Sequence, residues 1–120
     1  MSEQVCLRAV DIVGSQFCVA SDDGQKVHDA IAPALRAGKR VVLSFEGVTD
    51  VTSAFLNAAI GQLYSEFSEQ EIKAGLSVSQ ASNDDLYILK RVVDRAKEFF
   101  KEPSRFEQAV AEVLGEDDDA

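Results

Sequence analysis

The centre of the chain contains one nearly continuous apolar run, Arg40-Val41-Val42-Leu43-Ser44-Phe45-Glu46. Runs of this kind are typical of strands that are covered on both faces, most often in parallel sheets. A connection follows, Gly47-Val48-Thr49-Asp50-Val51-Thr52, and a helix is predicted to begin at Thr52 or Ser53 and to end near Phe67. This strand, loop and helix predict a domain of the α/β class.

Two short β-prone runs precede this unit, at residues 5–10 and 16–20. Because only a brief Gly-containing turn separates them, the sequence predicts an antiparallel hairpin. A helix is predicted at residues 25–37, where apolar residues recur at helical spacing and Gly38 stands at the position of a C-terminal cap. Pro33 removes a backbone hydrogen bond inside this helix, so we expect a kink or a broken first turn there.

The C-terminal third of the chain predicts one more strand and two helices. Residues 72–78 alternate between apolar and polar side chains, which favours a strand. Asn83 is a suitable N-cap for the helix that follows. A capping box, Ser104-Arg105-Phe106-Glu107, predicts a last short helix within residues 101–115. The acidic tail, residues 116–120, is expected to be disordered.

The predicted order of elements is therefore β-β-α-β-α-β-α-α. Strands that alternate with helices around a buried central strand predict an α/β sandwich, in which a mixed four-stranded sheet carries its helices mainly on one face. The chain has 120 residues, which is enough for one domain. We assign that domain to residues 1–115.

Acidic residues dominate the charge of the chain. Twelve Lys and Arg stand against 21 Asp and Glu, and the formal net charge is −9. This charge opposes binding to nucleic-acid backbones and to anionic membrane surfaces. No apolar stretch approaches the roughly 20 residues of a membrane span. The first residues lack the pattern of a signal peptide, so we expect a cytoplasmic protein.

The sequence offers no metal site, cofactor motif or catalytic constellation. One histidine and two cysteines cannot supply the about four ligands of a structural zinc site. Cys6 and Cys18 are expected to be small buried hydrophobic side chains without a disulfide. His28 lies one position off an apolar stripe and is expected to be exposed and inert. Since no nucleophile elbow, phosphate loop or HExxH motif is present, we assign no catalytic residue and expect no enzyme activity.

The connection at residues 48–57 lies where the central strand leads into a helix. In open α/β sheets functional groups concentrate at this edge. Asp, Thr and Ser are good N-caps, which accounts for these residue types without a function. A hydroxyl at the start of a helix is also a favourable place for a phosphate, because the free N–H groups and the helix dipole stabilise negative charge. Both interpretations stay open on local chemistry.

Two short motifs beside this connection resemble the STAS superfamily, Phe45-Glu46-Gly47-Val48 and Thr52-Ser53-Ala54-Phe55. STAS domains occur in bacterial anti-sigma factor antagonists and in the cytosolic tails of sulfate transporters. The closer resemblance is to the STAS-like domain family of unknown function, and the order of elements extends it over residues 5–100. The resemblance implies a STAS-like sandwich that acts through protein–protein interaction.

In anti-sigma factor antagonists the corresponding loop carries a serine that accepts phosphate from a kinase of the GHKL ATPase type. Ser53 stands at that serine, and Thr52 stands at the preceding aspartate, with Asp50 as the nearest acid. The resemblance implies a phosphoacceptor at Ser53 and a partner-binding surface that comprises Asp50, Thr52, Ser53 and Asn57. The partner would be a GHKL-type ATPase or a regulator in a partner-switching circuit. Phe55 replaces a glycine of the motif and is expected to pack under the helix.

Other functions stay open on the sequence alone. The same helix start could bind a nucleotide or another anion, although residues 48–57 contain no Lys or Arg. The acidic tail would suit an inhibitor or nucleic-acid mimic of the phage or defence type. An enzyme would need Ser53 or His28 in its mechanism. The C-terminal helices, which carry Phe99, Phe100 and Phe106, could form a homodimer patch.

Overall fold

Strand β3 (Arg40–Ser44) lies at the centre of the main sheet, as the apolar run predicts. The computed structural model describes residues 3–100. Strand β3 pairs in parallel with β1 (Gln4–Arg8) on one side and with β5 (Leu76–Ser79) on the other. The Val41 and Leu43 side chains of β3 are buried. The prediction of a parallel central strand is confirmed.

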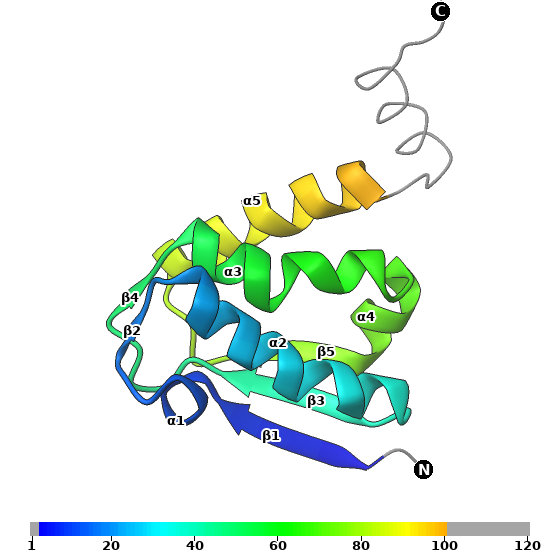
Figure 1. Cartoon of the computed structure of the whole chain (residues 1–120), viewed down its shortest axis with the longest axis horizontal. Helices are drawn as coiled ribbons and strands as arrows, with labels where there is room; N and C mark the ends of the chain where they lie inside the picture. Colours follow the sequence, from blue (N-terminus) through cyan, green and yellow to red (C-terminus); the bar gives the residue numbers. More distant parts are fainter. Residues whose placement is uncertain (1–2, 101–120) are drawn as a thin grey trace, which may run out of the picture.

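The helices cover one face of this sheet (Figure 1). Among residues 3–100 the opposite face, which bears Cys6, Val42 and Ser77, has no helix over it, and the Cys6 and Ser77 side chains are exposed. The prediction that the helices lie mainly on one face is therefore confirmed. The helices on the covered side are α2 (Ser21–Arg36), α3 (Ser53–Ala59), α4 (Glu69–Gly75) and α5 (Asn83–Phe100).

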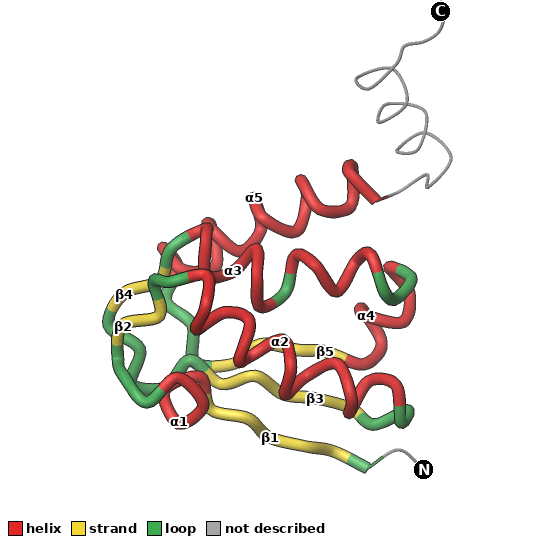
Figure 2. Tube along the Cα trace, in the orientation of Figure 1, coloured by secondary structure: helices red, strands yellow, loops and turns green. Residues whose placement is uncertain are grey.

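The predicted antiparallel hairpin is wrong. The expected turn is replaced by a short helix, α1 (Ala9–Val13), which buries Ala9 against the core. Strand β2 (Phe17–Cys18) then pairs in parallel with β4 (Asp50–Val51) instead of with β1. The described residues therefore form a three-stranded parallel sheet and a separate two-stranded pair, rather than one mixed sheet of four strands (Figure 2).

Helix α2 begins four residues before the predicted start and continues through Pro33. The proline lies in the last turn, and the predicted break does not occur. Pro33 lacks a backbone N–H and therefore removes only one hydrogen bond, near the end of a long helix. The helix ends as predicted, because the Gly38 N–H donates to the Leu35 carbonyl at 3.0 Å and the Lys39 N–H donates to the Ala34 carbonyl at 2.9 Å.

The helix predicted to reach Phe67 is shorter than expected. It ends at Ala59 as α3, and a 3₁₀ helix, η1 (Gly61–Ser65), continues the segment. The strand predicted at residues 72–78 begins only at Leu76, because residues 69–75 form α4. A capping box starts α4: the Ser68 hydroxyl accepts from the Glu71 N–H at 3.1 Å, and the Glu71 carboxylate accepts from the Ser68 N–H at 2.8 Å.

The start of α5 also differs by one residue from the prediction. The Ser82 hydroxyl, not the Asn83 side chain, accepts a hydrogen bond from the Asp85 N–H at 3.0 Å. Ser82 is therefore the N-cap, and Asn83 is the first residue of the helix. The helix and the acidic tail predicted beyond residue 100 lie outside the described residues.

Helices α2 and α3 pack against each other closely above the sheet. The backbones meet at Gly24, where a Cβ atom would lie only 2.3 Å from the Phe55 carbonyl oxygen and 2.8 Å from the Ala58 Cβ. Glycine is required there because any larger residue would force the helices apart. The core beneath them is formed by fully buried side chains that include Val27, Ile31, Leu43, Phe55, Leu56 and Leu63.

The two cysteines occupy different environments. Cys18 is buried, as predicted, whereas Cys6 is exposed on the uncovered face of the sheet, so the prediction for Cys6 is wrong. Both are free thiols. Burial is the main cause that raises the pKa of the Cys18 thiol to about 11, and the nearby Asp23 and Asp85 charges add to it. Within residues 3–100, no helix combines the length and the apolarity needed to cross a membrane.

Candidate functional site

The connection between β3 and α3 begins with a tight turn. The Val48 N–H donates to the Phe45 carbonyl at 3.0 Å, and Gly47 adopts a φ of +83°. Only glycine accepts this conformation readily, which explains the Phe-x-Gly-Val step in physical terms. Phe45 is buried and anchors the turn on the core. The chain then forms β4 and enters α3 through Thr52.

Thr52 serves the fold. Its hydroxyl donates to the Val19 carbonyl at 2.6 Å and accepts from the Phe55 N–H at 3.2 Å, so it caps α3 and ties that helix to the segment after β2. Its own N–H donates to the Cys18 carbonyl at 3.3 Å. Since the hydroxyl both donates and accepts within the fold, its hydrogen bonds serve the cap of α3, and the predicted role of Thr52 in partner binding stays a prediction.

Ser53, Asp50 and Asn57 are placed differently from Thr52. Ser53 is the first residue of α3, its side chain is exposed, and its hydroxyl forms no hydrogen bond with any residue from 3 to 100. Asp50 on β4 and Asn57 one turn further along α3 are also exposed. Three of the four predicted residues are therefore exposed: Asp50 three residues before α3, Ser53 at its start and Asn57 one turn later.

Two apolar residues beside them were not predicted as site residues. Phe17 is 52% exposed and Val19 is 40% exposed. The β2–β4 pairing places Phe17 opposite Asp50, and the Thr52 hydrogen bond holds Val19 beside the start of α3. We use the name α3 surface for the exposed residues gathered here: Phe17, Val19, Asp50, Ser53, Ala54 and Asn57. Exposed aromatic and aliphatic side chains with a polar edge are typical of protein-binding sites.

The rim of the α3 surface is acidic. Asp22 and Asp23 stand in the first turn of α2, and Asp84 and Asp85 stand in the first turn of α5. The start of α2 lies against α3, because Gly24 meets Phe55 and Ala58, and the Asp23 and Asp85 charges help to raise the pKa of the Cys18 thiol on β2. No Lys or Arg occurs in residues 48–57. The exposed residues that α3 contributes to this surface, Ser53, Ala54 and Asn57, are uncharged.

We expect Thr52→Val to lower the free energy of unfolding by about 1–2 kcal/mol. The substitution keeps the shape of the side chain but leaves the Phe55 N–H and the Val19 carbonyl without their hydrogen-bond partner. Ser53→Ala is the matched control and should change stability by less than about 0.5 kcal/mol, because its hydroxyl is exposed and forms no such bond. Urea unfolding followed by circular dichroism measures both values. Equal losses for the two variants would contradict the assignment of the cap to Thr52.

His28 is not the exposed residue that the sequence predicts. It is 6% exposed, with Nε2 at 2.9 Å from the Glu66 Oε2 and Nδ1 at 3.1 Å from the Asp29 Oδ1. Glu66 also accepts from the Arg36 guanidinium at 3.0 Å. Hydrogen bonds from Gln25 and His28 lower the pKa of the Asp29 carboxyl. This network joins α2 to the residue after η1, so His28 contributes to the packing of these two segments.

Two other expectations concern metals and self-association. Within residues 3–100 no group of three or more His, Cys, Asp or Glu side chains could hold a metal ion. Phe99 is 55% exposed near the end of α5, and its ring lies edge-to-face on that of Phe100 at 4.9 Å. Phe106 lies outside the described residues, and the homodimer patch stays a prediction.

Comparison with known proteins matches residues 23–86 to a STAS-like domain of unknown function (DUF4325). No curated protein matches the chain, and no solved structure matches it. The matched segment runs from the first turn of α2 to the first turn of α5 and contains β3, the connection to α3 and most of the α3 surface. Because it covers more than half of the sequence, the chain belongs to this family of STAS-like domains.

Proposed function

We propose that the chain is a non-enzymatic protein-interaction domain that docks a partner on the α3 surface and releases it when Ser53 is phosphorylated. The observation that carries the proposal is the division of roles between two neighbouring hydroxyls. Thr52 is held in internal hydrogen bonds, whereas Ser53 is exposed and forms none with the described residues. A kinase could reach Ser53 without disturbing the cap of α3.

The composition of the α3 surface supports a protein as the partner. Phe17 and Val19 provide exposed apolar area, and Ser53, Ala54 and Asn57 on α3 are exposed and uncharged. Apolar and uncharged groups at the centre with charges at the edge are the usual anatomy of a protein interface. The acidic rim favours a partner whose contacting surface is basic at its edge.

Phosphorylation would change the centre of this surface most. A phosphate on Ser53 adds about −1.5 to −2 charges and three strong acceptor oxygens. Its place at the first residue of α3 is compatible with the helix, since negative charge is favourable there. In the docked state, however, the dianion would have to lose its water against partner groups that fit a neutral hydroxyl, which is costly. The unmodified form therefore binds, and the phosphorylated form is released.

The kinase in this proposal is a GHKL-type ATPase, as in the antagonists that the sequence resembles. Incubation with such a kinase and ATP should add one phosphate to the peptide that contains Ser53. The Ser53→Ala variant should remain unmodified under the same conditions. This control tests whether Ser53 is the residue that accepts the phosphate. Phosphate on another residue, or none at all with active kinase, would refute Ser53 as the acceptor.

Partner binding provides the second test. With the kinase or another purified partner, we expect Ser53→Asp to lower affinity tenfold or more and Ser53→Ala to change it little. Ser65→Asp is the control for charge, because Ser65 is exposed on η1 at the other end of the α3–η1 segment and receives the same charge, although it also loses the hydrogen bond from its hydroxyl to the Gln62 carbonyl at 2.7 Å. Calorimetric titration measures the three affinities. An equal effect of Ser53→Asp and Ser65→Asp would show that net charge, and not the α3 surface, controls binding.

A further inference from the structure

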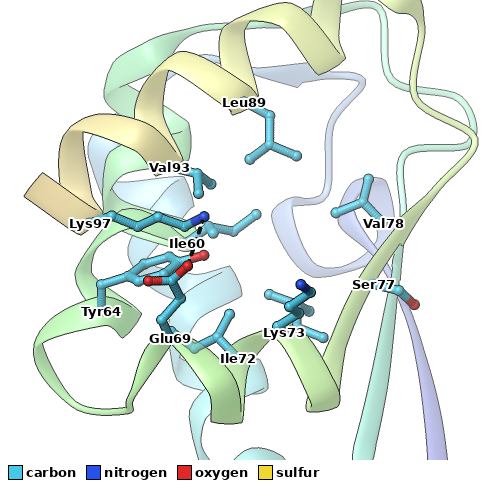
Figure 3. Close-up of a pocket in the computed structure, with 11 residues that line it drawn as sticks. Ile60, Tyr64, Glu69, Ile72, Lys73, Ser77, Val78, Leu89, Val93 and Lys97 are labelled. Atoms are coloured by element: carbon cyan, nitrogen blue, oxygen red, sulfur yellow. Dashed lines mark ion pairs between the residues drawn. The ribbon is translucent and has the colours of Figure 1, made fainter.

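A cavity of about 380 Å³ lies between α5 and the segment formed by α4 and β5 (Figure 3). Cavities of this size are common binding sites for small molecules. None of the residues that line it belongs to the α3 surface or to the connection at residues 48–57. Most of its wall is apolar and consists of Ile60, Ile72, Leu76, Val78, Leu89 and Val93.

The packing of α5 explains why the cavity exists. This helix packs mainly against η1 and α3 rather than against β5. Leu76 and Val78 on β5 are therefore only partly buried. Leu89 and Val93 extend from α5 into the same cavity, which Val78 borders from the other side (Figure 3). Binding of an apolar ligand in this cavity is favourable, because it removes apolar surface of both the ligand and the protein from water.

The polar groups at the cavity carry a net positive charge. The Lys97 ammonium lies 3.1 Å from the Glu69 carboxylate, beside the half-buried Tyr64 (Figure 3). Burial is the main cause that raises the pKa of the Tyr64 phenol, so its hydroxyl stays a hydrogen-bond donor. Lys73 forms no ion pair with any residue from 3 to 100. Two ammonium groups thus face one carboxylate, in a chain whose net charge is −9.

We propose that this cavity binds an apolar monocarboxylate of the medium-chain fatty-acid type. The alkyl chain would lie against the six apolar side chains, and the carboxylate would pair with the Lys73 ammonium. Complementarity of charge supports an anionic head group, because Lys73 is the cation at the cavity that lacks a counter-ion among the described residues. The size of the cavity supports a small molecule rather than a helix or strand of another protein.

Calorimetric titration of the full chain with decanoate, below its micelle concentration, tests the proposal. We expect saturable binding of one molecule per chain, and affinity that rises about fourfold with each added methylene from octanoate to decanoate. Methyl NMR should show shifts at Ile72, Leu89 and Val93 but not at Val27 and Ile31, which lie in the core away from the cavity. Absence of saturable binding, or shifts confined to other residues, would overturn the proposal.

The role of the ligand's carboxylate is tested separately from the role of its alkyl chain. Lys73→Gln should weaken decanoate binding about tenfold, because it removes a charged hydrogen-bond donor. Lys90→Gln is the matched control: this lysine is exposed on α5, pairs with Asp94 and does not line the cavity. Decylamine should bind far more weakly than decanoate. Decylamine that binds as tightly as decanoate, or no difference between the two lysine variants, would overturn the assignment of an anionic ligand.

Discussion

Gly24→Ala is expected to lower the free energy of unfolding by about 3 kcal/mol, although alanine is the better helix former. Helix propensity alone would make this substitution stabilising by up to about 1 kcal/mol. In the folded state, however, the added methyl would lie 2.3 Å from the Phe55 carbonyl oxygen, which is a backbone atom that cannot rotate away. Helices α2 and α3 would have to separate, and overpacking of this kind outweighs the gain in propensity.

Urea unfolding of the variant decides the sign of this effect. Gly75→Ala is a matched control, because a Cβ there would come too close to the Cδ2 end of the Leu35 side chain, at 2.8 Å, while the Lys39 carbonyl oxygen lies at an ordinary 3.8 Å. That side chain can adopt another rotamer, so we expect a loss below about 1 kcal/mol. If Gly24→Ala were stabilising, or no more harmful than Gly75→Ala, the close approach of α2 and α3 would be wrong.

Phe55→Ala is expected to cost about 3–5 kcal/mol, the range measured for large-to-small changes in protein cores. The ring is fully buried between α3 and the rest of the core, which confirms the prediction that Phe55 packs under the helix. The loss is a large fraction of the about 5–15 kcal/mol that stabilise a typical domain. Removing the ring therefore threatens the fold that presents Ser53 and Asn57.

Phe17→Ala is the control that separates packing from binding. This ring is 52% exposed, so its removal should cost less than about 1 kcal/mol of stability. It lies on the α3 surface, and its removal should weaken partner binding. Phe55→Leu keeps most of the buried volume and should cost less than about 1.5 kcal/mol. Comparable losses for Phe17→Ala and Phe55→Ala in thermal or urea unfolding would contradict the burial of Phe55.

Local signals in the sequence predicted the centre of the fold well. The apolar run at residues 40–46 became β3, because a strand that is paired on both sides needs a continuous apolar pattern. Gly38 ended α2, and Thr52 started α3, since caps act through hydrogen bonds within a few residues of the chain. Ser53 was also placed correctly at the first turn of α3.

The errors arise where distant parts of the chain decide the structure. Residues 9–13 form a helix instead of a hairpin turn, since β1 pairs with β3 and not with β2. The residues of β1 and their neighbours in the sequence do not indicate which strand will be the partner. The alternation at residues 72–78 suits a strand, yet the Ser68–Glu71 capping box and the burial of Ile72 produce α4. His28 is buried because Glu66 and Asp29 satisfy both ring nitrogens, and Glu66 is 38 residues away.

The α3 surface illustrates the same limit. Phe17 and Val19 were assigned to a predicted hairpin, so their position beside Ser53 could not be foreseen. The alternation around Cys18 gave a partial signal, because it indicated that Phe17 and Val19 share one side of a strand while Cys18 faces the core. Only the β2–β4 pairing shows that this side adjoins Asp50 and the start of α3.

The parallel sheet has a consequence for the order in which the protein folds. Cys6 pairs with Val42 and Val42 pairs with Ser77, so strand partners are roughly 35 residues apart in the chain. No hairpin can nucleate such a sheet, and each pairing must close a long loop before it gains any stabilising contact. We therefore expect the pairings of β3 with β1 and β5 to be consolidated late and refolding to be slow for a chain of this length. Until β3 is paired on both sides, its apolar run is exposed to other molecules, and refolding yield should fall as protein concentration rises.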